Sequence, residues 1–84
     1  MKAFEEIDVH SLTKAEAISM IDRLLKTCDG KTVSVRVIHG FHRGTTLQTT
    51  IRKHYAKHPR VLRVELGMNP GETDLILREN PRIS

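Results

Sequence analysis

The stretch VSVRVIHGFHRGTTLQ, residues 33–48, decides the fold of this chain. Its first six residues are rich in β-branched side chains, which favour a strand over residues 33–38. Glycines follow at positions 40 and 44, and apolar residues then recur at helical spacing, at positions 47, 51 and 55. The pattern therefore predicts a strand that leads through a glycine-containing loop directly into a helix.

The residues before this stretch repeat the same order. Ile7 and Val9 alternate with polar residues, which predicts a strand from Phe4 to His10. Thr13 and Glu16 have the spacing of a capping box, in which each side chain bonds the backbone amide of the other residue. The apolar spacing after them predicts a helix over residues 14–28, ended by Asp29-Gly30.

The residues after the stretch predict two further strands. The second helix ends at His58, because a residue before proline avoids helical geometry. Residues 61–66 form the third strand, Asn69-Pro70-Gly71 is a turn, and residues 73–78 form the fourth strand. The short last connection predicts that the fourth strand runs antiparallel to its neighbour.

The element order predicts the fold class. A βαβαββ chain with right-handed crossovers places both helices on one face of one mixed four-stranded sheet, which is a two-layer α/β sandwich. With 84 residues the chain is a single domain over residues 1–84. We expect its core at about residues 6–78 and a frayed tail at residues 79–84.

Charge is distributed unevenly along the chain. Lys plus Arg is 14 and Asp plus Glu is 10, a net charge of +4, yet no acidic residue lies between Lys31 and Val64. A local field of one sign attracts polyanions, so the sequence predicts a nucleic-acid-binding surface that includes Arg52 and Lys53. The alternative is a solvated basic helix whose charge is balanced by acidic neighbours in the fold.

Other features of the sequence indicate where in the cell the protein is located. No apolar run is long enough for a membrane span, and the acidic start of the chain is unlike a secretory signal. The single cysteine, Cys28, continues the apolar stripe of the first helix, so we expect it to be buried rather than reactive. A reducing, cytoplasmic location fits this cysteine content.

Candidate site residues lie in three loops expected at one edge of the sheet. Asp8 and His10 share a strand face, where a carboxylate can fix the tautomer of an imidazole, although a purely polar strand face is the alternative. His39 ends the next strand. The amides at the start of the second helix form an anion site, with Arg43 beside it. His54 and His58 have the spacing of two zinc ligands without an evident third, so no metal site is predicted there.

Three motifs together resemble the small MutS-related (Smr) domain family. Residues 8–13, DVHSLT, resemble its LDLHG signature, residues 37–44, VIHGFHRG, resemble its HGxG or TGxG loop, and residues 71–77, GETDLIL, resemble its closing strand. The likeness covers about residues 6–78 and is nearest to the short stand-alone bacterial type. It implies a fold similar to the C-terminal domain of a bacterial translation initiation factor.

The resemblance also implies nucleic-acid binding and an endonuclease activity on DNA or RNA. The implied catalytic residues are Asp8, His10 and His39. Of the expected nucleic-acid-binding residues, Gly40 and Gly44 follow from the resemblance. The others come from the basic segment, the start of the second helix and the loops at the same sheet edge, and they are His42, Arg43, Thr45, Arg52, Lys53, Asn69 and Gly71. The sequence identifies no definite cofactor, and cleavage of DNA calls for activated water with a candidate divalent ion at Asp8.

Two alternatives to a nuclease stay open at this point. One is a non-catalytic module that docks on DNA, RNA or the ribosome, and the other is a protein-binding adaptor without salt-dependent affinity for polyanions. No membrane partner is expected, and the sequence leaves the oligomeric state open.

Overall fold

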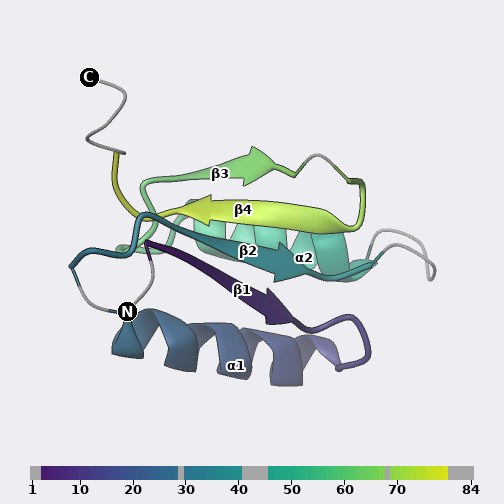
Figure 1. The fold of residues 1–84 in the computed structure, drawn as a ribbon. Coiled ribbons are helices and arrows are strands. Elements are labelled where there is room, and N and C mark those ends of the chain that lie inside the picture. Colours follow the sequence, from purple (N-terminus) through teal and green to yellow (C-terminus); the bar gives the residue numbers. More distant parts are fainter. Residues whose placement is uncertain (1–2, 29, 41–45, 68, 80–84) are drawn as a thin grey trace.

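The computed structural model of the chain describes residues 3–28, 30–40, 46–67 and 69–79. The described elements follow the predicted βαβαββ order (Figure 1). They are β1 (Phe4–Asp8), α1 (Lys14–Thr27), β2 (Ser34–Ile38), α2 (Thr46–Ala56), β3 (Arg63–Leu66) and β4 (Glu72–Ile76).

The four strands form one mixed sheet in the order β1-β2-β4-β3. β1 runs parallel to β2, with Ile7 opposite Val37. β4 lies between β2 and β3 and is antiparallel to both. The predicted antiparallel last strand is therefore confirmed, and β1 and β3 are the two edges of the sheet.

The ends of several strands differ from the sequence prediction. β1 stops at Asp8 instead of continuing to His10, because the chain turns there: the carboxylate of Asp8 accepts a hydrogen bond from the backbone amide of His10, at 3.0 Å. β3 begins at Arg63 rather than at Val61, because Val61 still donates a turn hydrogen bond to the carbonyl of His58, at 3.0 Å.

The predicted capping box starts α1. The Thr13 hydroxyl accepts from the amide of Glu16 at 3.2 Å, and the Glu16 carboxylate accepts from the amide of Thr13 at 2.9 Å. These bonds satisfy amides that a helix start otherwise leaves unpaired. One face of the helix then buries Ala17, Ile21 and Leu25.

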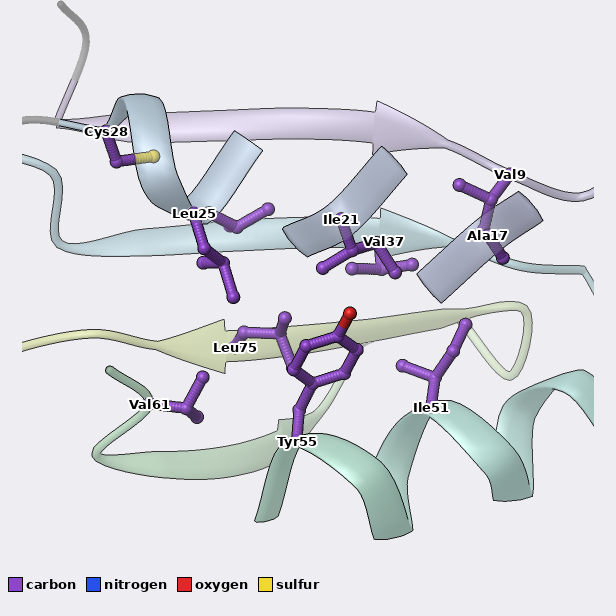
Figure 2. Packing of buried hydrophobic residues seen from close by; sticks show 11 residues of the cluster. Val9, Ala17, Ile21, Leu25, Cys28, Val37, Ile51, Tyr55, Val61 and Leu75 are labelled. Atoms are coloured by element: carbon purple, nitrogen blue, oxygen red, sulfur yellow. The ribbon is translucent and has the colours of Figure 1, made fainter. Parts of the chain in front are cut away.

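The core lies between one face of the sheet and both helices. Figure 2 shows side chains of α1 and α2 converging on Val37 of β2 and Leu75 of β4. The Tyr55 ring of α2 is fully buried, and its hydroxyl lies 2.7 Å from a carboxylate oxygen of Asp22 in α1. Burial and this bond raise the pKa of Tyr55 far above its ordinary value, so the hydroxyl stays protonated. Cys28 is buried in the same cluster, as the sequence predicts.

The opposite side of the sheet, which we call the outer face, is exposed or half-buried and highly charged. Strand side chains alternate between faces, and the register sets Arg36 opposite Glu6 on one side and Asp74 on the other. The Arg36 Nε lies 3.2 Å from Asp74 and 3.7 Å from Glu72. The charged residues of the outer face in the described strands are Glu6, Asp8, Arg36, Arg63, Glu65, Glu72 and Asp74.

Neither helix in the described part of the chain has the length and apolar character needed to cross a membrane.

Candidate functional site

Three chain segments meet at the edge of the sheet where β1 and β2 end. The carbonyl of Gly71 accepts hydrogen bonds from the amides of His39, at 2.8 Å, and Gly40, at 2.9 Å. Gly40 has a positive φ of 69°, and a side-chain carbon added there would lie 3.4 Å from the Cβ of His10. One added to Gly71 would lie 3.1 Å from the Cα of Gly40. Glycine at 40 and 71 therefore lets the three segments approach closely, which the sequence predicts for Gly40 but not for Gly71.

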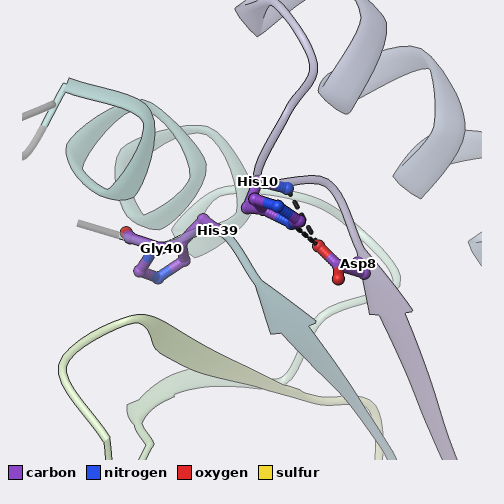
Figure 3. A network of polar contacts seen from close by, with 4 residues as sticks. All are labelled: Asp8, His10, His39 and Gly40. Carbon is purple, nitrogen blue, oxygen red and sulfur yellow. Dashed lines mark hydrogen bonds and ion pairs between the residues drawn. The ribbon is translucent and has the colours of Figure 1, made fainter. Parts of the chain in front are cut away.

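Asp8 and His10 form a hydrogen-bonded pair at this edge. Asp8 Oδ1 lies 2.5 Å from His10 Nδ1 and 3.0 Å from the backbone nitrogen of His10 (Figure 3). The hydrogen bond from the ring and then that from the amide hold the pKa of Asp8 below its ordinary value. Both side chains are exposed, by 52% for Asp8 and 60% for His10, so a large ligand can reach them.

The pair sets which ring nitrogen of His10 is available to a ligand. A carboxylate only accepts hydrogen bonds, so His10 donates from Nδ1. In the neutral ring the lone pair is then on Nε2, the nitrogen on the far side of the ring from Asp8. A carboxylate-oriented imidazole of this kind can take up a proton at Nε2 and release it again.

His39 has a different environment, because it is 97% buried and both of its ring nitrogens have partners. Nδ1 donates to the carbonyl of Gly40 at 2.8 Å, and Nε2 lies 2.8 Å from the hydroxyl of Thr73. That hydroxyl also accepts from the Nε of Arg52 at 2.9 Å, so its own proton goes to His39. Burial, and less strongly the nearby charge of Arg52, lower the pKa of His39.

The burial of His39 separates its environment from those of the other two expected catalytic residues, Asp8 and His10. Asp8, His10 and His39 do lie at the same edge of the sheet (Figure 3). His39, however, presents neither ring nitrogen to solvent, so it is placed to hold Gly40 and Thr73 rather than to exchange a proton with a ligand.

Thr73 is a polar residue that sequence reasoning missed. It lies in β4 with 0% exposure, and its hydroxyl joins β2, β4 and α2 through His39 and Arg52. Its only signal in the sequence is a hydroxyl among apolar residues in the inward positions of a strand. The partners lie 34 and 21 residues away, so no local pattern reports the bond.

The expected basic surface is divided among several faces. Arg36 and Arg63 lie on the outer face and pair with acidic residues there. Arg60 donates to the carbonyl of Cys28 at 3.3 Å. Arg52 is half-buried against Thr73, which leaves Lys53 of α2 and Lys57, just after the helix, as exposed cations.

The remaining candidate residues have these positions. The carbonyl of Asn69 accepts from the amide of Glu72 at 3.1 Å, which closes the turn between β3 and β4. The Gln48 side chain of α2 donates to the carbonyl of Pro70 in that turn, at 2.9 Å. His42, Arg43, Gly44 and Thr45 lie outside the described residues. Within the described part of the chain, no three His, Cys, Asp or Glu side chains are grouped to hold a metal ion.

Comparisons with known proteins agree with this geometry. A family model for the Smr domain matches residues 7–72. The fold is also similar to the crystal structure of the Smr domain of MutS2 from Thermus thermophilus, with a TM-score of 0.78 and 26% sequence identity. That match covers 89% of this chain and 99% of the other. A comparison with curated proteins gives no significant match.

Proposed function

Because the chain belongs to the Smr domain family, we propose that it binds nucleic acid and cleaves a phosphodiester bond at the sheet edge that carries Asp8 and His10. The observation that carries this proposal is the exposed carboxylate–imidazole pair, with 2.5 Å between Asp8 Oδ1 and His10 Nδ1. The pair combines an oriented proton-transfer group with access for a polymer.

In this proposal His10 moves the proton. On RNA, Nε2 takes the proton of a 2′-hydroxyl as its oxygen attacks the adjacent phosphorus. The bond to the 5′-oxygen then breaks, and the imidazolium returns a proton to that leaving oxygen. Asp8 keeps Nδ1 protonated and stabilises the imidazolium between the two transfers. DNA has no 2′-hydroxyl, so there the same base would act on a water molecule.

His39 receives a positioning role in place of a catalytic one. Its Nδ1 holds the carbonyl of Gly40, and its amide and that of Gly40 share the carbonyl of Gly71. These bonds fix the backbone beside His10, where a phosphate has to approach. Arg43 and the amides after it stay the proposed phosphate ligands on sequence grounds.

The experiment that tests the proposal is cleavage of labelled RNA and DNA by the pure chain. We expect wild-type cleavage and loss of cleavage in His10→Ala, with nucleic-acid affinity retained. Ends with a 2′,3′-cyclic phosphate identify the 2′-hydroxyl route, and a parallel reaction with EDTA reports a divalent ion. His54→Ala is the matched control, because His54 is an exposed histidine of α2. Full cleavage by His10→Ala would reject the assignment.

A binding module without cleavage is the second candidate. It is supported by the exposed lysines Lys53, on α2, and Lys57, just after it, which can contact phosphates without any role in proton transfer. If the wild type binds RNA or DNA with a steep salt dependence and cuts neither, this candidate replaces the nuclease. The same titration extended to ribosomes tests that particular partner.

A further inference from the structure

β3 is an edge strand with apolar side chains exposed beside it. The sheet order leaves β3 paired on one side only, to β4 (Figure 1). Leu66 in this strand is 71% exposed, and Leu62, just before it, is 54% exposed. Natural proteins commonly protect an edge with charge, proline or a covering element, because unpaired backbone groups attract another strand. β3 carries two charged residues, yet the two exposed leucines beside its free edge favour an interaction.

The charged residues of β3 are arranged so that the strand complements itself. Arg63 and Glu65 lie two residues apart on the outer face, and 47% of each side chain is exposed. Val64 lies between them. If the strand is turned through 180° about Val64, Arg63 and Glu65 exchange places, and Leu62 exchanges places with Leu66.

We propose that β3 pairs antiparallel with β3 of a second copy of this chain, about a two-fold axis at Val64. In this register each Leu62 lies opposite Leu66 of the second copy, and each Arg63 lies opposite Glu65 of the second copy. One symmetric contact thus buries the exposed leucines together and pairs the opposite charges on both sides of the axis. The two sheets become one continuous sheet.

The backbone groups of Val64 have the phase that this register needs, whereas the amide of Leu62 already donates to the carbonyl of Ile76 in β4, at 2.7 Å. Along an antiparallel strand, the N–H and C=O groups of one residue bond the strand on one side, and those of the next residue point toward the other side. The amide of Gly67 donates to the carbonyl of Glu72 in the ladder between β3 and β4, at 3.3 Å. The register between those strands continues to Leu66 opposite Thr73 and Glu65 opposite Asp74. By alternation, the N–H and C=O of Val64 face away from β4, toward the free edge where the second copy would bind.

The other edge of the sheet does not have this symmetry. β1 carries Glu5, Glu6 and Asp8 and no basic residue, so antiparallel pairing with its own copy about Glu6 sets like charges together. β1 also carries the Asp8 end of the proposed active site. A dimer through β3 therefore leaves that site open, and the dimer proposal can be tested independently of the nuclease proposal.

The first test is sedimentation equilibrium of the full chain over a range of concentrations. We expect a concentration-dependent dimer. Arg63→Glu alone and Glu65→Arg alone should each raise the dimer dissociation constant by about tenfold or more, because each change turns both cross-axis charge pairs into repulsions. Phe4→Lys is the matched control at the β1 edge, where Phe4 is 58% exposed, and it should leave the dimer intact.

The decisive test mixes the two charge variants. Arg63→Glu and Glu65→Arg have opposite charges at both positions, so an equimolar mixture should recover association that neither variant shows alone. The intrachain contact between Arg63 and Glu65 cannot produce this result, because mixing does not restore it within either chain. A wild-type chain that stays monomeric at all concentrations, or a mixture that fails to associate, would overturn the proposal. Loss of the dimer in Phe4→Lys would also overturn it.

Discussion

The imidazole of His39 accepts a hydrogen bond from the hydroxyl of Thr73, with 2.8 Å between Nε2 and Oγ1. The same hydroxyl accepts from Arg52 Nε at 2.9 Å. One buried side chain thus fixes the end of β2, the middle of the sheet and the second helix relative to each other. The loop beside His10 is built on that connection, since His39 also holds the carbonyl of Gly40.

Thr73→Val should destabilise the fold although it keeps the shape of the side chain. The change leaves Nε2 of His39 and Nε of Arg52 without their shared partner, and a buried polar group without a partner costs about 1–3 kcal/mol. Urea unfolding measures the loss. Thr73→Ser keeps the hydroxyl and should recover part of the stability, so a valine variant as stable as wild type would contradict the network.

Acid should weaken the fold through His39. Its pKa is lowered in the folded state, so as pH falls below the ordinary value of 6.5 the unfolded chain binds a proton before the folded chain does. The free energy of unfolding therefore decreases from that pH down to the folded pKa. We expect His39→Gln to flatten this dependence in urea titrations between about pH 7.5 and 5, a range chosen around the ordinary imidazole pKa. The exposed His54→Gln should keep it.

Asp8→Asn should slow cleavage and leave nucleic-acid affinity nearly unchanged. The amide cannot stabilise the imidazolium of His10 as a carboxylate does, and positioned acid–base groups contribute roughly 10²–10⁴-fold to rates. Single-turnover cleavage together with a binding titration separates the two effects. Glu6→Gln is a control on the same strand face. Equal losses in both variants would point to the general charge of the outer face.

Lys53→Glu should reduce the affinity for nucleic acid across sequences. Each lost phosphate contact lowers the slope of log K against log salt by about 0.7–0.9. Arg52 is left in place, because its Nε supports Thr73 and its loss would also affect the fold. Lys26→Glu makes the same charge change in the last turn of α1 and should have a smaller effect. Equal slopes for wild type and Lys53→Glu would remove this residue from the interface.

Gly71→Ala should disturb the site more than the fold. The new Cβ would lie 3.1 Å from the Cα of Gly40, so the backbone beside His10 has to shift. We expect reduced cleavage with a small change in the free energy of unfolding. Gly30→Ala is the matched control, because its Cβ would meet only the end of the Arg78 side chain, at 3.5 Å. Equal activity in the two variants would show that the contact between Gly40 and Gly71 is not required.

Much of the fold could be predicted because its signals are local. The capping box of Thr13 and Glu16 and the alternation in β2 each lie within a few residues of sequence. The antiparallel direction of β4 follows from a short connection. The strand ends at Asp8 and Arg63 were missed, because side-chain and turn hydrogen bonds end the extended geometry where the residue pattern continues.

The candidate site was predictable only in part for the same reason. Asp8 and His10 are two residues apart, so strand parity alone brings them together. The role of His39 depends on Thr73, 34 residues away, and no pattern along the chain reports that contact. In the sequence, Arg36 likewise belongs to a basic segment. In the fold, Asp74 of β4 lies beside it and forms an ion pair with it.

The charges of the outer face make the charge distribution of the molecule asymmetric. The described strands carry five carboxylates and two guanidinium groups on this face. The exposed Lys53 lies on α2, on the other side of the sheet, and the exposed Lys57 follows that helix. A polyanion therefore repels the outer face of the protein and attracts the side that carries α2. The torque acts before contact, over roughly 10 Å at 0.1 M salt, and turns the protein during the approach. Most encounters then begin with the helical side toward the polymer, so added salt should slow association as well as weaken the complex.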